Sequence, residues 1–490
     1  MPIERRTLLK STAAAGAAGG PFAGLMAMPA EAHKPPNPGA LVPIPDERDG
    51  AVRLHLPRGF RYRSFHDTEQ PVTLTDGTAL PGRHDGMGAF DGPRKSVVLV
   101  RNHELNNPGP AFGPDPEKAY DAQAQGGTTT IQVTPTGEVI RAFTSLNGTM
   151  MNCSGGRMPW GSWVSCEETV NGPDVGPDFT GVPNVPLTKP HGYVFEVPVS
   201  HLPGRGQSDR KPITHAGRFA HEAVSFDPKG GRLYLTEDNF AFPSGFFRYR
   251  PPRDPMKVGR LLDGGTLQML KVRGVDNAHL EAAQVTGATY DVEWVDIPEP
   301  NVEYDFTAGV EAPTPNDTAL VHVSSQGWAQ GAAFFSRLEG QAYDKGVVYF
   351  TSTQGGGPAE TVMQDEEEGF GNGSGQVWAY DVKRRTLTCI FQSPGPLVLD
   401  LPDNVTTSKH GTLVVCEDNT DNNFIRGLSR RGQLFDIALN RLRSSTGVDR
   451  SNDEFAGSTF SPDGQTLFVN IQASRGLTFA IWGPWRKIGV

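Results

Sequence analysis

The chain has 490 residues and a formal net charge of −10 at pH 7, with 45 Lys and Arg against 55 Asp and Glu. This acidic balance disfavours nucleic acid as a partner and allows cation binding, whereas a phosphate substrate would need metals or Arg to offset the repulsion. Hydrophobic residues make up 37% of the chain, which also contains 58 Gly and 41 Pro. That profile is typical of many short strands joined by turns, and it argues against a helical bundle.

Residues 1–32 have the features of an export signal. Arg5 and Arg6 precede a small, apolar, alanine-rich region from Thr12 to Met28, and Ala30-Glu31-Ala32 fits a cleavage site. We therefore expect a twin-arginine signal peptide, passage of the folded protein through the twin-arginine export machinery, and a periplasmic or secreted location. No other stretch reaches the roughly 18 apolar residues needed to span a bilayer, so we expect no stable membrane anchor.

After a Pro-rich link, a two-part unit recurs along residues 33–490. Each copy starts with a short strand that carries one acid or thiol among small residues, and an apolar strand ending in acidic or amide residues follows. The six first strands contain Asp85, Cys153, Glu222, Glu339, Asp403 with Asn404, and Glu454. The second strands end with Glu104, Glu168, Glu237, Asp238, Glu417 and Asp418. Repeated units of this kind predict an all-β fold, a single six-bladed β-propeller domain over 33–490.

Two further features complete the predicted blades. Most copies are followed by a third strand that alternates apolar and polar residues, starting at His191, Gly245, Gly375, Gly432 and Thr478. The spacing between the third and fourth copies is longer, through an insert at about 251–330 that is Pro-rich and mixed in pattern. We interpret this insert as a lid or a solvated excursion.

The first strands predict a metal site. In a propeller the innermost strand of each blade lines the central channel, so one residue per blade would form a ring. Carboxylates crowded into a narrow channel are tolerable only when they are protonated or bound to metal. Oxygen ligands suit a hard cation such as Ca²⁺, while the Cys153 thiol suits iron or zinc, so a mixed site is the sharper hypothesis. The alternative is structural, with acids that hydrogen-bond between blades and a thiol that packs.

Arg337 lies two residues before Glu339 and should face the same side of the strand. A guanidinium beside a metal cluster is a good bidentate clamp for phosphate, and the equal alternative is an ion pair that balances the acids. His84, His103 and His221 adjoin ligand positions, and because adjacent strand residues face opposite ways we favour core or supporting roles for them.

Cysteine pairing stays open at this level. Cys153, Cys166, Cys389 and Cys416 could form two disulfides in an oxidising compartment, and Cys153 could pair with Cys166 across a hairpin. Other catalytic signatures are missing from the sequence: it has no G-x-S-x-G elbow, no H-E-x-x-H, no Walker loop and no dinucleotide fingerprint.

Several long motifs run through most of the mature chain: N-C-x-G-G-x-x-P-W-G-x-W-x-x-C-E-E from Asn152, G-R-F-x-H-E from Gly217, R-x-E-G from Arg337, a D-N-V strand from Asp403, and E-x-x-G-x-x-F-S-P-D-G-x-x-L-F-V-N-I-Q from Glu454. With the twin-arginine leader, they resemble the PhoX-type alkaline phosphatases. The resemblance implies a six-bladed propeller whose channel holds Fe³⁺ and Ca²⁺ and which hydrolyses phosphate monoesters at alkaline pH. The chain looks like a short member, and its His84-Asp85-Gly86-Met87 motif lacks the paired asparagines of better-known members.

Carried over by motif, the resemblance implies a ligand set. Cys153, Glu168, Glu222 and Glu339 look like iron and calcium ligands, Glu454, Glu237 and Asp238 look like further metal ligands, and Arg337 resembles the arginine that holds phosphate. We thus expect an exported, monomeric, metal-dependent phosphomonoesterase that acts on small molecules. The alternatives are a calcium-dependent propeller lactonase or phosphotriesterase, and a non-catalytic calcium-binding propeller.

Overall fold

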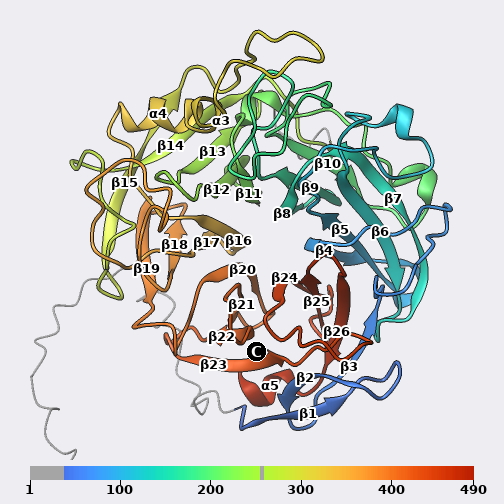
Figure 1. The fold of residues 1–490 in the computed structure, drawn as a ribbon. Helices are drawn as coiled ribbons and strands as arrows, with labels where there is room; N and C mark the ends of the chain where they lie inside the picture. The colour runs from blue at the N-terminus through green and yellow to red at the C-terminus, as the bar shows by residue number, and fades with distance from the viewer. Residues whose placement is uncertain (1–37, 254–258) are drawn as a thin grey trace, which may run out of the picture.

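A computed structural model describes residues 38–253 and 259–490, and the leader predicted over 1–32 lies outside this range. Antiparallel sheets are arranged like blades around a common centre (Figure 1). Their first strands are β4 His84–Asp91, β8 Asn152–Met158, β11 His221–Asp227, β16 Leu338–Asp344, β20 Pro402–Thr407 and β24 Glu454–Phe460. Each first strand contacts the next and β24 contacts β4, so they form a closed ring. The predicted all-β propeller fold is confirmed.

Each first strand starts a sheet that extends outward. The first three sheets continue through β5 Val97–His103, β6 Gly126–Val133 and β7 Val139–Thr149; through β9 Ser162–Glu167 and β10 Val194–Pro198; and through β12 Arg232–Glu237, β13 Phe246–Arg250 and β14 Thr266–Val272. The next three continue through β17 Val347–Ser352, β18 Gln376–Asp381 and β19 Thr386–Gln392; through β21 Leu413–Glu417, β22 Phe424–Leu428 and β23 Leu434–Asn440; and through β25 Thr466–Gln472 and β26 Leu477–Trp482.

One predicted third strand is wrong. The segment from Gly432 leads into β23, which is the fourth strand of its sheet, because β22 lies between β21 and β23. The sequence of β22 does not indicate a buried strand, because a charged residue, Arg426, stands at its centre. The fold compensates this charge with Glu417, whose carboxylate oxygen lies 2.9 Å from Arg426 Nε.

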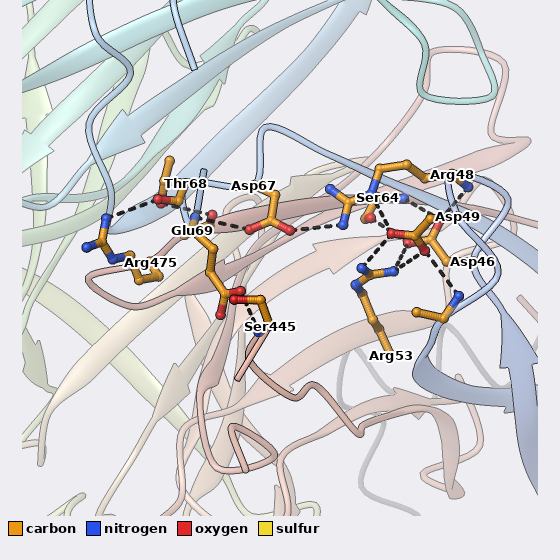
Figure 2. A network of polar contacts seen from close by, with 12 residues as sticks. Asp46, Arg48, Asp49, Arg53, Ser64, Asp67, Thr68, Glu69, Ser445 and Arg475 are labelled. Carbon is orange, nitrogen blue, oxygen red and sulfur yellow. Dashed lines mark hydrogen bonds and ion pairs between the residues drawn. The ribbon is translucent and has the colours of Figure 1, made fainter. Parts of the chain in front are cut away.

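The N-terminal strands, which the sequence reading did not assign, close the ring. β1 Leu41–Pro45 and β2 Val52–Pro57 extend the fifth sheet beyond β23, and β3 Arg61–Phe65 pairs with β26 as the outer strand of the sixth. Figure 2 shows the polar contacts at this junction, where Arg53 donates to the carboxylates of Asp46 at 2.8 Å and Asp49 at 2.7 Å. The two chain ends are therefore joined by strand pairing, so opening the ring requires breaking a sheet.

Small residues let the first strands approach one another, as predicted. A Cβ atom on Gly86 would lie 2.5 Å from the Cα atom of Ser154, and one on Gly340 would lie 2.6 Å from the Cα atom of Asn404. Any larger residue at these two positions would push neighbouring blades apart. The hydrophobic core is divided into clusters, the largest of which packs the fifth and sixth blades around residues such as Phe455, Val469 and Ile425.

The predicted insert at about 251–330 is built into the blades where the structure describes it. It supplies β14, then β15 Thr289–Ile297, α3 Asn316–Leu320 and α4 His322–Trp328. β15 pairs with β14 and with β19, and so joins the third and fourth sheets edge to edge. A last helix, α5 Trp485–Ile488, follows β26. None of the helices within the described ranges is both long and apolar enough to cross a membrane.

Candidate metal centre

The predicted ring of side chains meets at one cavity of about 230 Å³, at the ends where the first strands begin. Its lining comprises Asp85, Cys153, Glu222, Glu339, Asp403 and Glu454 from the ring; Glu104, Glu168, Asp418 and Gln472 from the ends of second strands; and two arginines, Arg83 and Arg337. The structure thus brings together residues from all six blades. A larger cavity of about 590 Å³ lies toward the other ends of the first strands, and Asp344 is its single acid, so it has no comparable ligand set.

A shared β-bulge aims the ring residues. In the first blade His84 pairs with His103 but Met87 pairs with Arg101, so one extra residue is accommodated around Asp85. The same shift surrounds the ring residue in the next four blades. A bulge bends its strand and turns a side chain out of the regular alternation. The sixth blade differs, because its shift falls after Ala456, and Glu454 reaches the cavity from an earlier position opposite Gln472.

A second repeated feature fixes the ends of the second strands. In five blades, the backbone carbonyl two residues before the ring residue accepts a hydrogen bond from the N–H of the last inward residue of the second strand. The donor and acceptor residues are Glu104 to Arg83 at 3.0 Å, Glu168 to Met151 at 2.9 Å, Asp238 to Ala220 at 3.1 Å, Thr353 to Arg337 at 2.9 Å, and Asp418 to Leu401 at 3.0 Å. Four of these acceptors, all except Ala220, have φ between 37° and 45°. This left-handed conformation costs a non-glycine residue on the order of 1 kcal/mol, so the same strain recurs around the cavity.

The paired acids at the strand ends face opposite ways. Asp238 belongs to the acid cluster, but the carboxylate of Glu237 accepts hydrogen bonds from Ser324 Oγ of α4 at 2.7 Å and from Gly245 N–H at 2.8 Å. The structure therefore does not bring Glu237, predicted as a further metal ligand, to the cavity. Strand alternation is the reason, because only one of two adjacent residues can face the centre. Glu167 likewise points away and accepts from Gly192 N–H at 2.9 Å.

Ligand atoms form three linked groups, within each of which the atoms lie within 4.8 Å of one another. The groups are Cys153 with Glu168 and Glu222, Glu168 with Asp238 and Glu339, and Glu222 with Glu339 and Asp403. Because members are shared, the groups form one continuous cluster. One buried oxygen of Asp85 also has no hydrogen-bond partner among the described residues. A thiol beside carboxylates, with an unpartnered buried oxygen nearby, fits a cluster of transition-metal and hard cations.

The raised pKa values in the cluster indicate that its ionised groups need compensating positive charge. Burial first, and then neighbouring carboxylates, raise the pKa values of Glu168, Glu222 and Glu339 well above the usual range. Burial likewise raises the pKa of the Cys153 thiol. Asp238 is the exception: burial alone would raise its pKa, but Arg337 outweighs burial and lowers it. Bound cations would favour the ionised forms of the other groups in the same way.

Arg337 makes the ion pair that the sequence offered as one of two alternatives for it. Its Nε and Nη2 both donate to Asp238, Nη2 at 2.8 Å, and Nη2 also donates to Glu339 at 2.9 Å. Its Nη1 makes no hydrogen bond to any residue in the described ranges, and the side chain lines the cavity. The ion pair is therefore present, and the Nη1 edge of the guanidinium has no hydrogen bond to a described residue.

The histidines next to the ring do not line the cavity. His84 Nε2 contacts Pro81 O at 3.1 Å, His103 lies between Gly82 O and Thr129 Oγ1, and His221 Nε2 contacts Gly217 O at 2.9 Å. They tie the first strands to the preceding loops, in line with the supporting role that strand alternation predicts. The four cysteines are buried, and none forms a disulfide within the described part of the chain. Cys153 is thus a free thiol at the cavity.

Sequence reasoning missed Arg83 and Gln472, which line the cavity. A signal for Arg83 was present, because Arg83 stands two residues before Asp85 as Arg337 stands two before Glu339. Gln472 Nε2 donates to the Glu104 carboxylate, which also accepts from Arg83. These contacts connect the sixth blade with the first at the cavity wall.

Comparison with known families decides the membership of this chain. The family model of alkaline phosphatase PhoX matches residues 40–140 and 134–474. The chain belongs to the alkaline phosphatase PhoX family. Membership supports a metal-dependent phosphoesterase function, in agreement with the acid cluster. None of the curated proteins is a significant match to this sequence.

One solved structure shares the architecture, and a second aligns more distantly. PhoX of Pseudomonas fluorescens in complex with vanadate, a transition state analogue, superposes with a TM-score of 0.62 at 17% identity, over 91% of this chain and 98% of that chain. The gluconolactonase XC5397 of Xanthomonas campestris aligns with a TM-score of 0.38 at 11% identity, over 91% of this chain and 99% of that chain. At 17% identity, the comparison with PhoX of Pseudomonas fluorescens supports a shared fold.

Proposed function

We propose that this protein is an exported, metal-dependent alkaline phosphatase that hydrolyses small-molecule phosphate monoesters. The observation that carries the proposal is the meeting of one thiol, eight carboxylates and two arginines at a single cavity in a chain of the PhoX family. A small cavity lined by charged groups from every blade suits a compact, highly charged ligand rather than a large apolar one.

The donor set suggests which ions the cluster holds. Cys153 with Glu168 and Glu222 would hold Fe³⁺, because a thiolate favours a transition metal. Glu222 with Glu339 and Asp403 offers oxygen ligands alone and would hold Ca²⁺. Bound cations would polarise the phosphoryl oxygens and lower the pKa of a bound water.

The protein's own residues orient the substrate. Asp238 fixes the guanidinium of Arg337 through two donor atoms, so the free Nη1 edge has a defined direction into the cavity. A guanidinium in this position would bind the phosphoryl oxygens and neutralise charge on the transferring group. Asn102 holds the chain around Cys153, since its Nδ2 donates to Cys153 O at 3.0 Å and to Ser154 O at 2.6 Å.

Metal analysis combined with turnover of p-nitrophenyl phosphate tests the proposal. We expect stoichiometric metal and hydrolysis in the wild type, and loss of both metal and hydrolysis in Glu222→Gln, because Glu222 belongs to two of the three ligand groups. Stoichiometric metal in a wild-type protein that turns over no phosphate ester would defeat the enzyme assignment and leave the metal site standing.

Export is a separate part of the proposal, supported by the leader sequence at 1–32. We propose that the folded protein passes through the twin-arginine machinery, acts in the periplasm or outside the cell as a monomer without a stable membrane anchor, and does not bind nucleic acid. Replacing Arg5 and Arg6 by Lys should retain the protein in the cytoplasmic fraction, and an unchanged distribution would argue against this route.

A further inference from the structure

Arg83 and Arg337 occupy the same structural position in two opposite blades. Arg83 precedes β4 and Arg337 precedes β16, and these strands lie three places apart in the ring of six, on opposite sides of the centre (Figure 1). Both residues are left-handed, with φ of 45° and 37°. Each carbonyl accepts the N–H of the residue at the end of its second strand, Glu104 or Thr353. The backbone therefore presents the two side chains to the cavity in the same way.

The two guanidiniums also use their donors alike. Arg83 Nε donates to Glu104 O at 2.6 Å and Nη2 donates to the Glu104 carboxylate at 2.6 Å. As in Arg337, Nη1 of Arg83 makes no hydrogen bond within the described ranges, and its side chain lines the cavity with 32% exposure. In both arginines, acids fix one edge of the guanidinium and leave the Nη1 edge open.

Charge and size favour one anion between these two edges. The cavity measures about 230 Å³, and both arginines line it. Asp418, a lining residue whose side chain makes no hydrogen bond in the described part, lies within electrostatic reach of both Arg83 and Arg337. Two guanidinium groups favour a dianion over a monoanion by simple Coulomb attraction.

We propose that Arg83 is a second phosphoryl-binding residue, which faces Arg337 across the cavity and selects the dianionic phosphoryl group of a monoester over the monoanionic group of a diester. The inference rests on the proposed phosphatase function and adds a residue that determines specificity. The competing role is purely structural, in which Arg83 only balances Glu104 at the cavity wall.

Calorimetric titration of the purified, metal-containing protein with inorganic phosphate tests this role. Arg83→Gln should weaken phosphate binding by at least about tenfold, the loss expected for a hydrogen bond to a charged group, with unchanged metal content. Arg83→Lys should recover part of the affinity because it keeps the charge but not the fork. The control Arg384→Gln removes a surface arginine, 55% exposed and paired with Asp381, and should bind phosphate like the wild type.

Turnover adds a readout that structural damage would not produce. In Arg83→Gln, kcat/KM for p-nitrophenyl phosphate should fall more than kcat/KM for bis(p-nitrophenyl) phosphate. The proposal is overturned if Arg83→Gln with intact metals binds phosphate as tightly as the wild type, or if Arg83→Gln and Arg83→Lys both lose metal. A wild type that binds phosphate without hydrolysing any ester contradicts the phosphatase assignment alone, because the affinities of the variants still judge Arg83. A wild type that neither binds phosphate nor hydrolyses any ester overturns both the role of Arg83 and the phosphatase assignment.

Discussion

Arg337 holds Asp238 through two donors, with Nε 3.1 Å from Oδ1 and Nη2 2.8 Å from Oδ2. This pair joins the third blade to the fourth at the wall of the cavity, and it keeps Asp238 ionised among carboxylates whose pKa values are raised. The same contact fixes the direction of the arginine that we assign to the phosphoryl group. Several measurable properties depend on it.

Asp238→Asn should lower kcat/KM for p-nitrophenyl phosphate by about 10- to 100-fold, because the arginine loses the charged partner that orients it. Steady-state kinetics on samples of known metal content would measure the effect. Asp381→Asn is the matched control, since Asp381 holds the exposed Arg384 at 2.8 Å, does not line the cavity, and should leave the kinetics unchanged when replaced. Wild-type kcat/KM in Asp238→Asn would show that the pair does not position Arg337.

Cys153→Ser should remove the thiolate that favours iron. We expect the variant to lose iron and any visible iron–thiolate absorption while keeping part of its calcium, as measured by elemental analysis and absorption spectroscopy. Cys166→Ser is the control, because Cys166 is a buried thiol in the same blade that does not line the cavity. Retention of iron in Cys153→Ser would contradict the assignment of this ligand.

Removal of metal should make stability fall as pH rises. Burial raises the pKa of Asp403 from 3.8 to about 6, and burial also raises the pKa values of Glu222 and Glu339 well above their usual range. Because the folded state then binds more protons than the unfolded state, this contribution is complete below about pH 4 and is lost as pH rises through 6 and beyond.

Thermal unfolding of chelator-treated and metal-loaded protein between pH 5 and 8 would measure this dependence. The chelated protein should have a Tm that decreases across the range, whereas bound cations should flatten the curve. Identical curves in both states would mean that the carboxylates hold no cations.

Arg53→Gln should weaken the closure of the ring. Arg53 pairs with Asp46, whose side chain is fully buried and also accepts a hydrogen bond from Ser64 N–H at 3.1 Å. Loss of the guanidinium leaves that carboxylate underpaired, and we expect a loss of about 1 to 3 kcal/mol in the free energy of unfolding. Arg443→Gln, which breaks an exposed pair with Asp449 at 3.7 Å, serves as control. Activity at 25 °C should stay near wild type in both variants, because neither touches the cavity.

Local sequence patterns predicted the fold and most of the residues that line the cavity. Strand alternation and the repeat of small residues beside one acid or thiol are local properties, so they can be read from neighbouring residues. They indicated the propeller and placed Asp85, Cys153, Glu222, Glu339 and Asp403 at its centre, where the structure has them. They also separated the histidines from the cavity.

Tertiary structure alone decided contacts between distant segments. β3 pairs with β26 more than 400 residues away, for example Thr478 with Phe65, and no local pattern encodes that partner. Glu237 and Asp238 are chemically similar neighbours, and only the registration of β12 and the packing of Ser324 from α4 settle which one faces the cluster. Arg83 lies opposite Arg337 because ring closure sets their two blades on opposite sides of the centre. Local sequence specifies the direction of a side chain along its strand, whereas what that side chain meets depends on how the blades close.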